Sequence, residues 1–204
     1  MHVIFDLDGT LIDSQASILD SLSRAAYLIT RRRMKTEDIR IGAPIEAILT
    51  RSYPNLKSSV IADIVAEFRD DYDNTGWSGY SLYPGVNSTI APLSKRHDVY
   101  VATNKPSLPT RKILKHSGIF DLLKRSYSLG YMDSCNKIEL VARLLEENPG
   151  ESILIGDSGD DLMAATGNRI DFIYCSYRYG AIEASEVNNK RAIRDLQELT
   201  LLLN

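Results

Sequence analysis

The chain has 204 residues with a formal net charge of -3; 44% of the residues are hydrophobic and 25% are charged. This composition is that of a globular protein. It excludes general nucleic-acid binding through a basic surface, and no apolar run is long enough to make a membrane a partner. The two cysteines give neither a disulfide framework nor a metal-ligand pattern, and no secretion signal begins the chain, so we expect a cytoplasmic location.

The first residues combine a short apolar run with two carboxylates. Residues 3–5 predict a strand buried on both faces, and Asp6 and Asp8 follow it directly. Side chains two positions apart share one side of a strand, so both carboxylates are expected to face the same crevice. Clustered carboxylates repel each other and a cation relieves that repulsion, which makes Mg²⁺ a candidate ligand. The alternative interpretation is a plain acidic turn.

Residues 15–80 are predicted to be helical throughout. Apolar residues recur at helical spacing in three segments, 15–29, 45–51 and 61–72. Ser14 is the expected cap of the first helix, and the Asn- and Gly-containing segment 74–79 ends the pattern. We therefore expect a helical domain over 15–80, inserted into a second domain that consists of 1–14 and 81–204.

From residue 81 onward, strands and helices alternate. Apolar runs predict strands at 98–103, 126–129, 152–157 and 171–175, and helical spacing falls between them. The spacing from Ala192 to Leu199 predicts a closing helix. This alternation predicts an α/β fold with a Rossmann-like parallel sheet, whose ligands bind at the carboxyl ends of the strands. Six polar residues fall at or just beyond these ends: Asp6, Asp8, Thr103, Asn104, Asp157 and Asp161.

Four motifs give the chain a resemblance to a known family. They are residues 6–14 (DLDGTLIDS), residues 102–106 (ATNKP), Lys137, and residues 156–161 (GDSGDD). In this order they resemble the motifs of the haloacid dehalogenase-like hydrolase superfamily, within it the phosphoglycolate-phosphatase-like branch. The resemblance covers nearly the whole chain. It implies an α/β core, a helical cap over 15–80, and a Mg²⁺-dependent phosphatase that acts on a small phosphorylated metabolite.

The resemblance also implies a role for each catalytic residue. Asp6 would be the nucleophile that becomes an aspartyl-phosphate, and Asp8 would protonate the leaving group and then deprotonate water. Thr103 would hydrogen-bond the phosphoryl group, and Lys137 would neutralise Asp6 and the phosphate. A carboxylate that attacks a phosphate meets like charge, so cations such as Mg²⁺ and Lys137 have to offset the repulsion. The dehalogenase branch lacks an acid at the position of Asp8, so its presence favours phosphoryl chemistry.

The metal and substrate residues follow from the same resemblance. Mg²⁺ would be held by Asp6, by the backbone carbonyl of Asp8, and by Asp157, with Asp161 as a ligand or as an anchor for the metal's waters. Asp160 competes with Asp161, but Asp161 has the family's spacing from Asp157, and the other interpretation of Asp160 is a helix cap. The candidate substrate-binding residues are Asn104, Gly9 and Arg40.

Several alternatives stay open at this point. A capped sugar-phosphate mutase would use the same Asp6 and Asp8 but retain the phosphoryl group, and a non-catalytic module would bind phosphorylated ligands without turnover. No proline follows Lys137, unlike in many relatives, so Lys105 is the rival lysine; its other interpretation is a loop lysine. Arg40 would either fork onto an anionic substrate tail or be a solvated surface residue. We expect a monomer or a weak dimer.

Overall fold

The computed structural model describes residues 1–36, 39, 45–129, 136–177 and 191–203. The chain separates into two compact units. One consists of Met1–Asp13 and Ser81–Asn204, and the other of Ser14–Tyr80. Among the residues so described, no helix combines the length and apolar character that crossing a bilayer requires.

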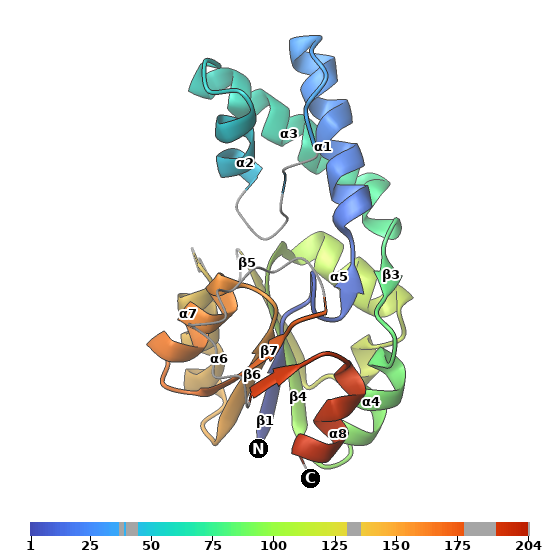
Figure 1. The fold of residues 1–204 in the computed structure, drawn as a ribbon, viewed down its shortest axis with the longest axis vertical. Helices are drawn as coiled ribbons and strands as arrows, with labels where there is room; N and C mark the ends of the chain where they lie inside the picture. Colours follow the sequence, from blue (N-terminus) through green and yellow to red (C-terminus); the bar gives the residue numbers. More distant parts are fainter. Residues whose placement is uncertain (37–38, 40–44, 130–135, 178–190, 204) are drawn as a thin grey trace. The chain divides into compact units, whose positions relative to one another are not determined.

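The larger unit is built on a parallel sheet that has six strands in the described part of the chain (Figure 1). The strands are β1 (His2–Phe5), β4 (Asp98–Pro106), β5 (Arg125–Leu129), β6 (Ser152–Gly156), β7 (Asp171–Cys175) and β8 (Ala192–Ile193). Their order across the sheet is β5-β4-β1-β6-β7-β8, and all pairs are parallel. The chain adds β4 and β5 on one side of β1 and then returns to add β6, β7 and β8 on the other. Open α/β sheets bind ligands at such a reversal, which here lies at β1.

Helices cover both faces of this sheet (Figure 1). The helices α6 (Lys137–Glu147) and α7 (Gly159–Gly167) pack on one face, where Ile4 of β1 belongs to the same buried cluster as Leu140 and Ala164. On the other face lie α4 (Val86–Leu93), the turn η5 (Leu196–Glu198) and α8 (Leu199–Leu202). α5 (Ser107–His116) contacts β4 and β5, and the turn η2 (Phe120–Leu122) follows it. The predicted α/β architecture is therefore confirmed.

The smaller unit is helical in its described residues. It contains α1 (Gln15–Thr30), α2 (Ile45–Ser52), α3 (Ser58–Asn74) and the turn η1 (Gly76–Ser78). Apolar faces of the three helices form one buried core, to which Leu22, Leu49 and Ile64 belong. Ser14 is the N-cap residue of α1, as predicted, but its side chain makes no cap hydrogen bond. The backbone carbonyl of Ser14 instead accepts hydrogen bonds from the Ile18 N–H and the Ser17 hydroxyl.

Two short strands mark the places where the chain leaves the larger unit and returns to it. They are β2 (Ile12–Asp13) and β3 (Ser81–Leu82), which pair in an antiparallel manner with Ile12 opposite Leu82. The two crossing segments are therefore held together by backbone hydrogen bonds rather than running separately.

Two predicted elements differ from the structure. The closing helix is wrong in its first half, because Ala192 and Ile193 form β8 beside β7, and helical turns begin only at Leu196. A two-residue strand carries too little periodicity to be read from sequence, and the free edge of β7 decides its conformation. The strand predicted at 98–103 continues to Pro106, which places Lys105 in β4 rather than in a loop.

Candidate active site

Three neighbouring strands deliver side chains to one edge of the sheet. Asp6 directly follows β1, Thr103 lies near the end of β4, and Asp157 directly follows β6. β1 pairs with both β4 and β6, and the Asp6 N–H still donates to the carbonyl of Ile155 at 2.9 Å. The carboxyl ends of parallel strands meet at the same edge, so these residues converge where the sheet topology reverses.

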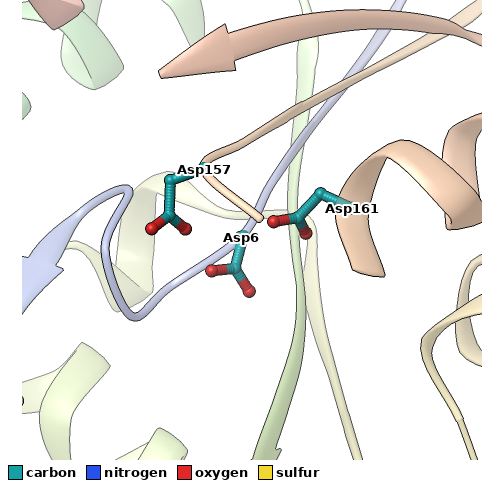
Figure 2. A group of neighbouring side chains, drawn as sticks. All are labelled: Asp6, Asp157 and Asp161. Atoms are coloured by element: carbon teal, nitrogen blue, oxygen red, sulfur yellow. The ribbon is translucent and has the colours of Figure 1, made fainter. Parts of the chain in front are cut away.

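Asp6, Asp157 and Asp161 form a cluster of buried carboxylates (Figure 2). Each offers one oxygen, and these oxygens lie within 4.8 Å of one another. Asp161 reaches the cluster from the first turn of α7, where its Oδ2 accepts hydrogen bonds from the backbone N–H and the hydroxyl of Ser158, at 3.0 Å and 2.6 Å. Ser158 is therefore the cap of α7, and the interpretation of Asp160 as its cap is wrong.

Burial raises the pKa values of the carboxyl groups in this cluster, because few positive charges of the described residues lie near enough to stabilise the ionised forms. Removal from water raises the pKa of Asp6 from 3.8 to about 7, although Lys137 opposes the rise. Burial, reinforced by the charge of Asp6, raises the pKa of Asp157 to about 8. Three hard oxygen donors that resist ionisation together are the donor set that suits Mg²⁺, so the residues present fit this ion.

Lys137 occupies the centre of this charge network. Its ammonium group bonds both Asp6 and Asp161, and its side chain is 3% exposed. It is the first residue of α6, which the side chain of Asn136 caps by accepting from the Glu139 N–H at 3.0 Å. A cation is disfavoured at a helix N-terminus, so the carboxylates have to offset that cost. They raise the pKa of Lys137 above its ordinary value even though burial acts in the opposite direction.

Asp8 is paired with a different lysine. The Nζ of Lys105 lies 3.1 Å from Oδ1 of Asp8, and the Lys105 side chain is 4% exposed. The interpretation of Lys105 as a loop lysine is therefore wrong. The pairing of β4 with β5 is irregular between Thr103 and Pro106, so a strict two-residue alternation does not describe Lys105. No sequence pattern therefore predicts its contact with Asp8.

Hydrogen bonds orient the polar side chains at the end of β4. The Thr103 Oγ1 accepts from the Lys105 N–H at 3.1 Å, which leaves the hydroxyl proton of Thr103 able to donate elsewhere. The Asn104 amide nitrogen donates to Asp160 Oδ2 at 2.8 Å. Asn104 and Asp160 thus link the second and fourth motifs. Arg40 lies outside the described residues.

The turn after Asp8 packs against the carboxylate of Asp157. Gly9 has φ +86°, and a Cβ there would lie 2.1 Å from Asp157 Oδ2. The Thr10 hydroxyl donates to Asp157 Oδ1 at 3.5 Å, and the Tyr177 hydroxyl donates to the Thr10 carbonyl at 2.7 Å. Sequence reasoning missed Tyr177, because a tyrosine after a strand has no pattern that separates it from an ordinary core residue. Thr10 and Tyr177 therefore fix the turn that carries Gly9.

The sequence profile of the haloacid dehalogenase-like hydrolases matches residues 3–175. The chain belongs to the haloacid dehalogenase-like hydrolase family. The family predicted from the four motifs is therefore confirmed. The match runs from β1 to β7 and includes all four motifs.

Relatives of this hydrolase carry different names. The tyrosine-protein kinase PtkA of Mycobacterium tuberculosis is 31% identical over 87% of this chain, which spans only 62% of that protein's length. A phosphoglycolate phosphatase of Psychrobacter arcticus is 27% identical, over 97% of this chain and 93% of that protein. Among solved structures, the haloacid dehalogenase-like hydrolase SP0104 from Streptococcus pneumoniae has a TM-score of 0.88 at 21% identity, covering 100% of this chain and 98% of that one. The last likeness confirms the fold.

Proposed function

We propose that this hydrolase is a Mg²⁺-dependent phosphatase that cleaves a small phosphate monoester through an aspartyl-phosphate on Asp6. The observation that carries the proposal is the contact of Lys137 with Asp6 inside a cluster of three buried carboxylates. A phosphoryl dianion and the Asp6 carboxylate repel each other, so positive charge is needed beside both. Lys137 supplies part of this charge from a fixed position.

The reaction divides into two displacements at phosphorus. In the first, a carboxylate oxygen of Asp6 forms a bond to phosphorus while the bond from phosphorus to the ester oxygen breaks. Asp8 donates a proton to the departing ester oxygen. In the second, Asp8 takes a proton from water as the water attacks the phosphorus, and the bond to Asp6 breaks to release inorganic phosphate. Acid–base help of this kind typically contributes about 10²–10⁴-fold.

The other residues position the phosphoryl group in this proposal. Thr103 donates its hydroxyl proton to a phosphoryl oxygen, and Asn104 and the turn at Gly9 border the same site. Asp6, the Asp8 carbonyl and Asp157 would hold Mg²⁺, and Asp161 would support it from α7. When bound, Mg²⁺ would offset the negative charge of phosphate and carboxylates.

Phosphoglycolate is the leading substrate candidate, because a relative that matches nearly the whole chain carries that name. In the same proposal, residues 15–80 form a helical cap that selects the substrate. The helical content of Ser14–Tyr80 and the paired crossing segments β2 and β3 support this role. The cytoplasmic location and the monomer or weak dimer stay predictions from the sequence.

A phosphate-release screen tests the proposal. Purified protein is incubated with phosphoglycolate, sugar phosphates and nucleoside monophosphates, with Mg²⁺ or with a chelator, and inorganic phosphate is measured. We expect Mg²⁺-dependent release that Asp6→Asn abolishes while the fold is retained. Asp98→Asn, the same change at the opposite end of β4, is the matched control and should keep its activity.

Two results would contradict the proposal. Unchanged release by Asp6→Asn would remove Asp6 from its role as nucleophile. Transfer of the phosphoryl group to a second position of the product, with no inorganic phosphate set free, would assign the site to a mutase instead.

Rapid quenching during turnover should also trap a hydroxylamine-sensitive phosphoryl group on Asp6, as expected for an acyl phosphate.

A further inference from the structure

Lys105 is a buried cation whose presence at the site needs an explanation. Its side chain is 4% exposed, while that of Asp8 is 15% exposed. Lysine is rarely buried without a partner, because removing an ammonium group from water is costly unless an opposite charge offsets it. The 3.1 Å contact with Asp8 provides that offset while Asp8 is ionised, and it remains a hydrogen bond when Asp8 carries the proton that it donates.

The two lysines of the site contact different aspartates. Lys137 reaches Asp6 and Asp161 from α6, whereas Lys105 reaches Asp8 from β4. The proposed nucleophile and the proposed acid therefore each have a cation of their own. This division is more specific than a general excess of positive charge around a phosphate.

The backbone of Lys105 is anchored by hydrogen bonds, whereas Asp8 lies on a turn. The Lys105 N–H donates to Thr103 Oγ1 at 3.1 Å, and the Lys105 carbonyl accepts from the Thr110 hydroxyl at 3.3 Å. Asp8 lies beyond the end of β1 and immediately before Gly9, whose φ is +86°. A site residue on a loop keeps its geometry when an anchored neighbour supports it, and the two backbone hydrogen bonds anchor Lys105 where the pairing of β4 with β5 is irregular.

We propose that Lys105 is a positioning residue that holds the carboxyl group of Asp8 in reach of the leaving-group oxygen. This inference rests on the proposed function, in which Asp8 is the general acid. Lys105 keeps all its protons: Asp8 passes its own proton to the leaving oxygen while Lys105 stays hydrogen-bonded to Oδ1. A general acid acts only within hydrogen-bond reach, and a misplacement of about 1 Å costs about 10²-fold in rate.

The dependence on the leaving group separates this role from others. An alkyl phosphate expels a poor leaving group that needs a proton, whereas p-nitrophenyl phosphate expels a stable anion that needs none. The ratio kcat/KM reports only the steps up to departure of the leaving group, so it excludes the later use of Asp8 as a base. A residue that acts through the acid therefore affects kcat/KM for the alkyl ester alone.

The experiment compares Lys105→Met, Lys105→Arg and Asp8→Asn, each with both esters. For Lys105→Met we expect kcat/KM to fall about 10²-fold with the alkyl phosphate, a loss that follows from acid misplacement, and to change little with p-nitrophenyl phosphate. Lys105→Arg restores a cation and should recover much of the loss. In the Asp8→Asn background, Lys105→Met should cause no further loss. This double variant removes both charges, so it keeps the test open if Lys105→Met alone fails to fold.

Several outcomes would overturn the proposal. An equal fall with both esters would make Lys105 a substrate-binding or purely structural residue, and an additive loss in the Asp8→Asn background would show that it does not act through Asp8. Crystal structures of the wild type and of Lys105→Met give a readout that does not depend on turnover. We expect the Asp8 carboxyl group to be displaced in the variant. An unmoved Asp8 would refute positioning, whereas a wild type that releases no phosphate would count against the proposed phosphatase.

Discussion

Replacing Gly9 by alanine perturbs the carboxylate cluster without removing any charge. Gly9 has φ +86°, and an added Cβ would lie 2.1 Å from Oδ2, 2.5 Å from Cγ and 2.7 Å from Oδ1 of Asp157. All three distances are far inside van der Waals contact. Asp157 is 2% exposed, so its carboxylate can move away from the new methyl group only by leaving its place beside Asp6.

Two separate costs follow from this geometry. The left-handed backbone at Gly9 strains any residue with a Cβ by about 1–2 kcal/mol, which lowers the free energy of unfolding. Relief of the contact shifts the Asp157 carboxylate by about 1 Å, since carbon and its non-bonded neighbours prefer separations of about 3.5 Å. A shift of about 1 Å at a catalytic site costs about 10²-fold in rate, so Gly9→Ala should lose at least that much of kcat/KM.

Gly118 provides a matched control for the backbone cost. It has φ +75°, and a Cβ there meets no atom within 4 Å. Gly118→Ala should therefore lose a similar free energy of unfolding but keep its phosphate release and its affinity for Mg²⁺. Urea unfolding, calorimetric titration with Mg²⁺ and the phosphate-release assay measure the three quantities. A Gly9→Ala protein with the Mg²⁺ affinity and turnover of the wild type would refute the reasoning.

Two further predictions concern the charges of the same cluster. Lys137→Met leaves Asp6 and Asp161 without their shared ammonium partner, and breaking such a buried pair costs about 3–5 kcal/mol of unfolding free energy. Mg²⁺ should restore part of this loss. A urea midpoint of Lys137→Met that equals that of the wild type without Mg²⁺ would contradict the predicted loss. The pKa of Asp6 is raised to about 7 and that of Asp157 to about 8, so without Mg²⁺ the native state binds more protons than the unfolded chain between about pH 4 and about pH 8. Its stability should therefore fall as the pH rises through this window, and Mg²⁺ should raise the melting temperature more at about pH 9 than at about pH 5. If Mg²⁺ raised the melting temperature by the same amount at both pH values, the ion and the protons would not compete for these carboxylates.

Strands such as β1 and β6 could be predicted because they are short apolar runs that are buried on both faces. Residues 3–5 and 152–156 carry this signal without ambiguity, and the polar residues that follow them mark the site edge. β8 could not be predicted in the same way, because Ala192 and Ile193 are too few to show a period and take their conformation from the edge of β7.

The contacts within the site were harder to foresee than its location. The strand pattern placed Asp6 and Asp157 at one edge and the family resemblance added Lys137, and all three meet there. The sequence could not assign Lys105 to Asp8, because β4 continues past Thr103 with an irregular pairing that no periodicity reveals. Tyr177 supports the turn at Thr10 through a single backbone hydrogen bond, which leaves no pattern in the sequence.

The number of charges at the site links the proposed cofactor to the two lysines. Asp6, Asp8, Asp157 and Asp161 are four carboxylates, and Lys105 and Lys137 are the two lysines that contact them among the described residues. When all are ionised, two negative charges remain, which one divalent cation balances. A monovalent ion would leave the cluster negative and repel a phosphate dianion, so this charge excess favours Mg²⁺ over a third lysine. The same reasoning explains why Asp8 has a lysine of its own: Lys137 already serves Asp6 and Asp161.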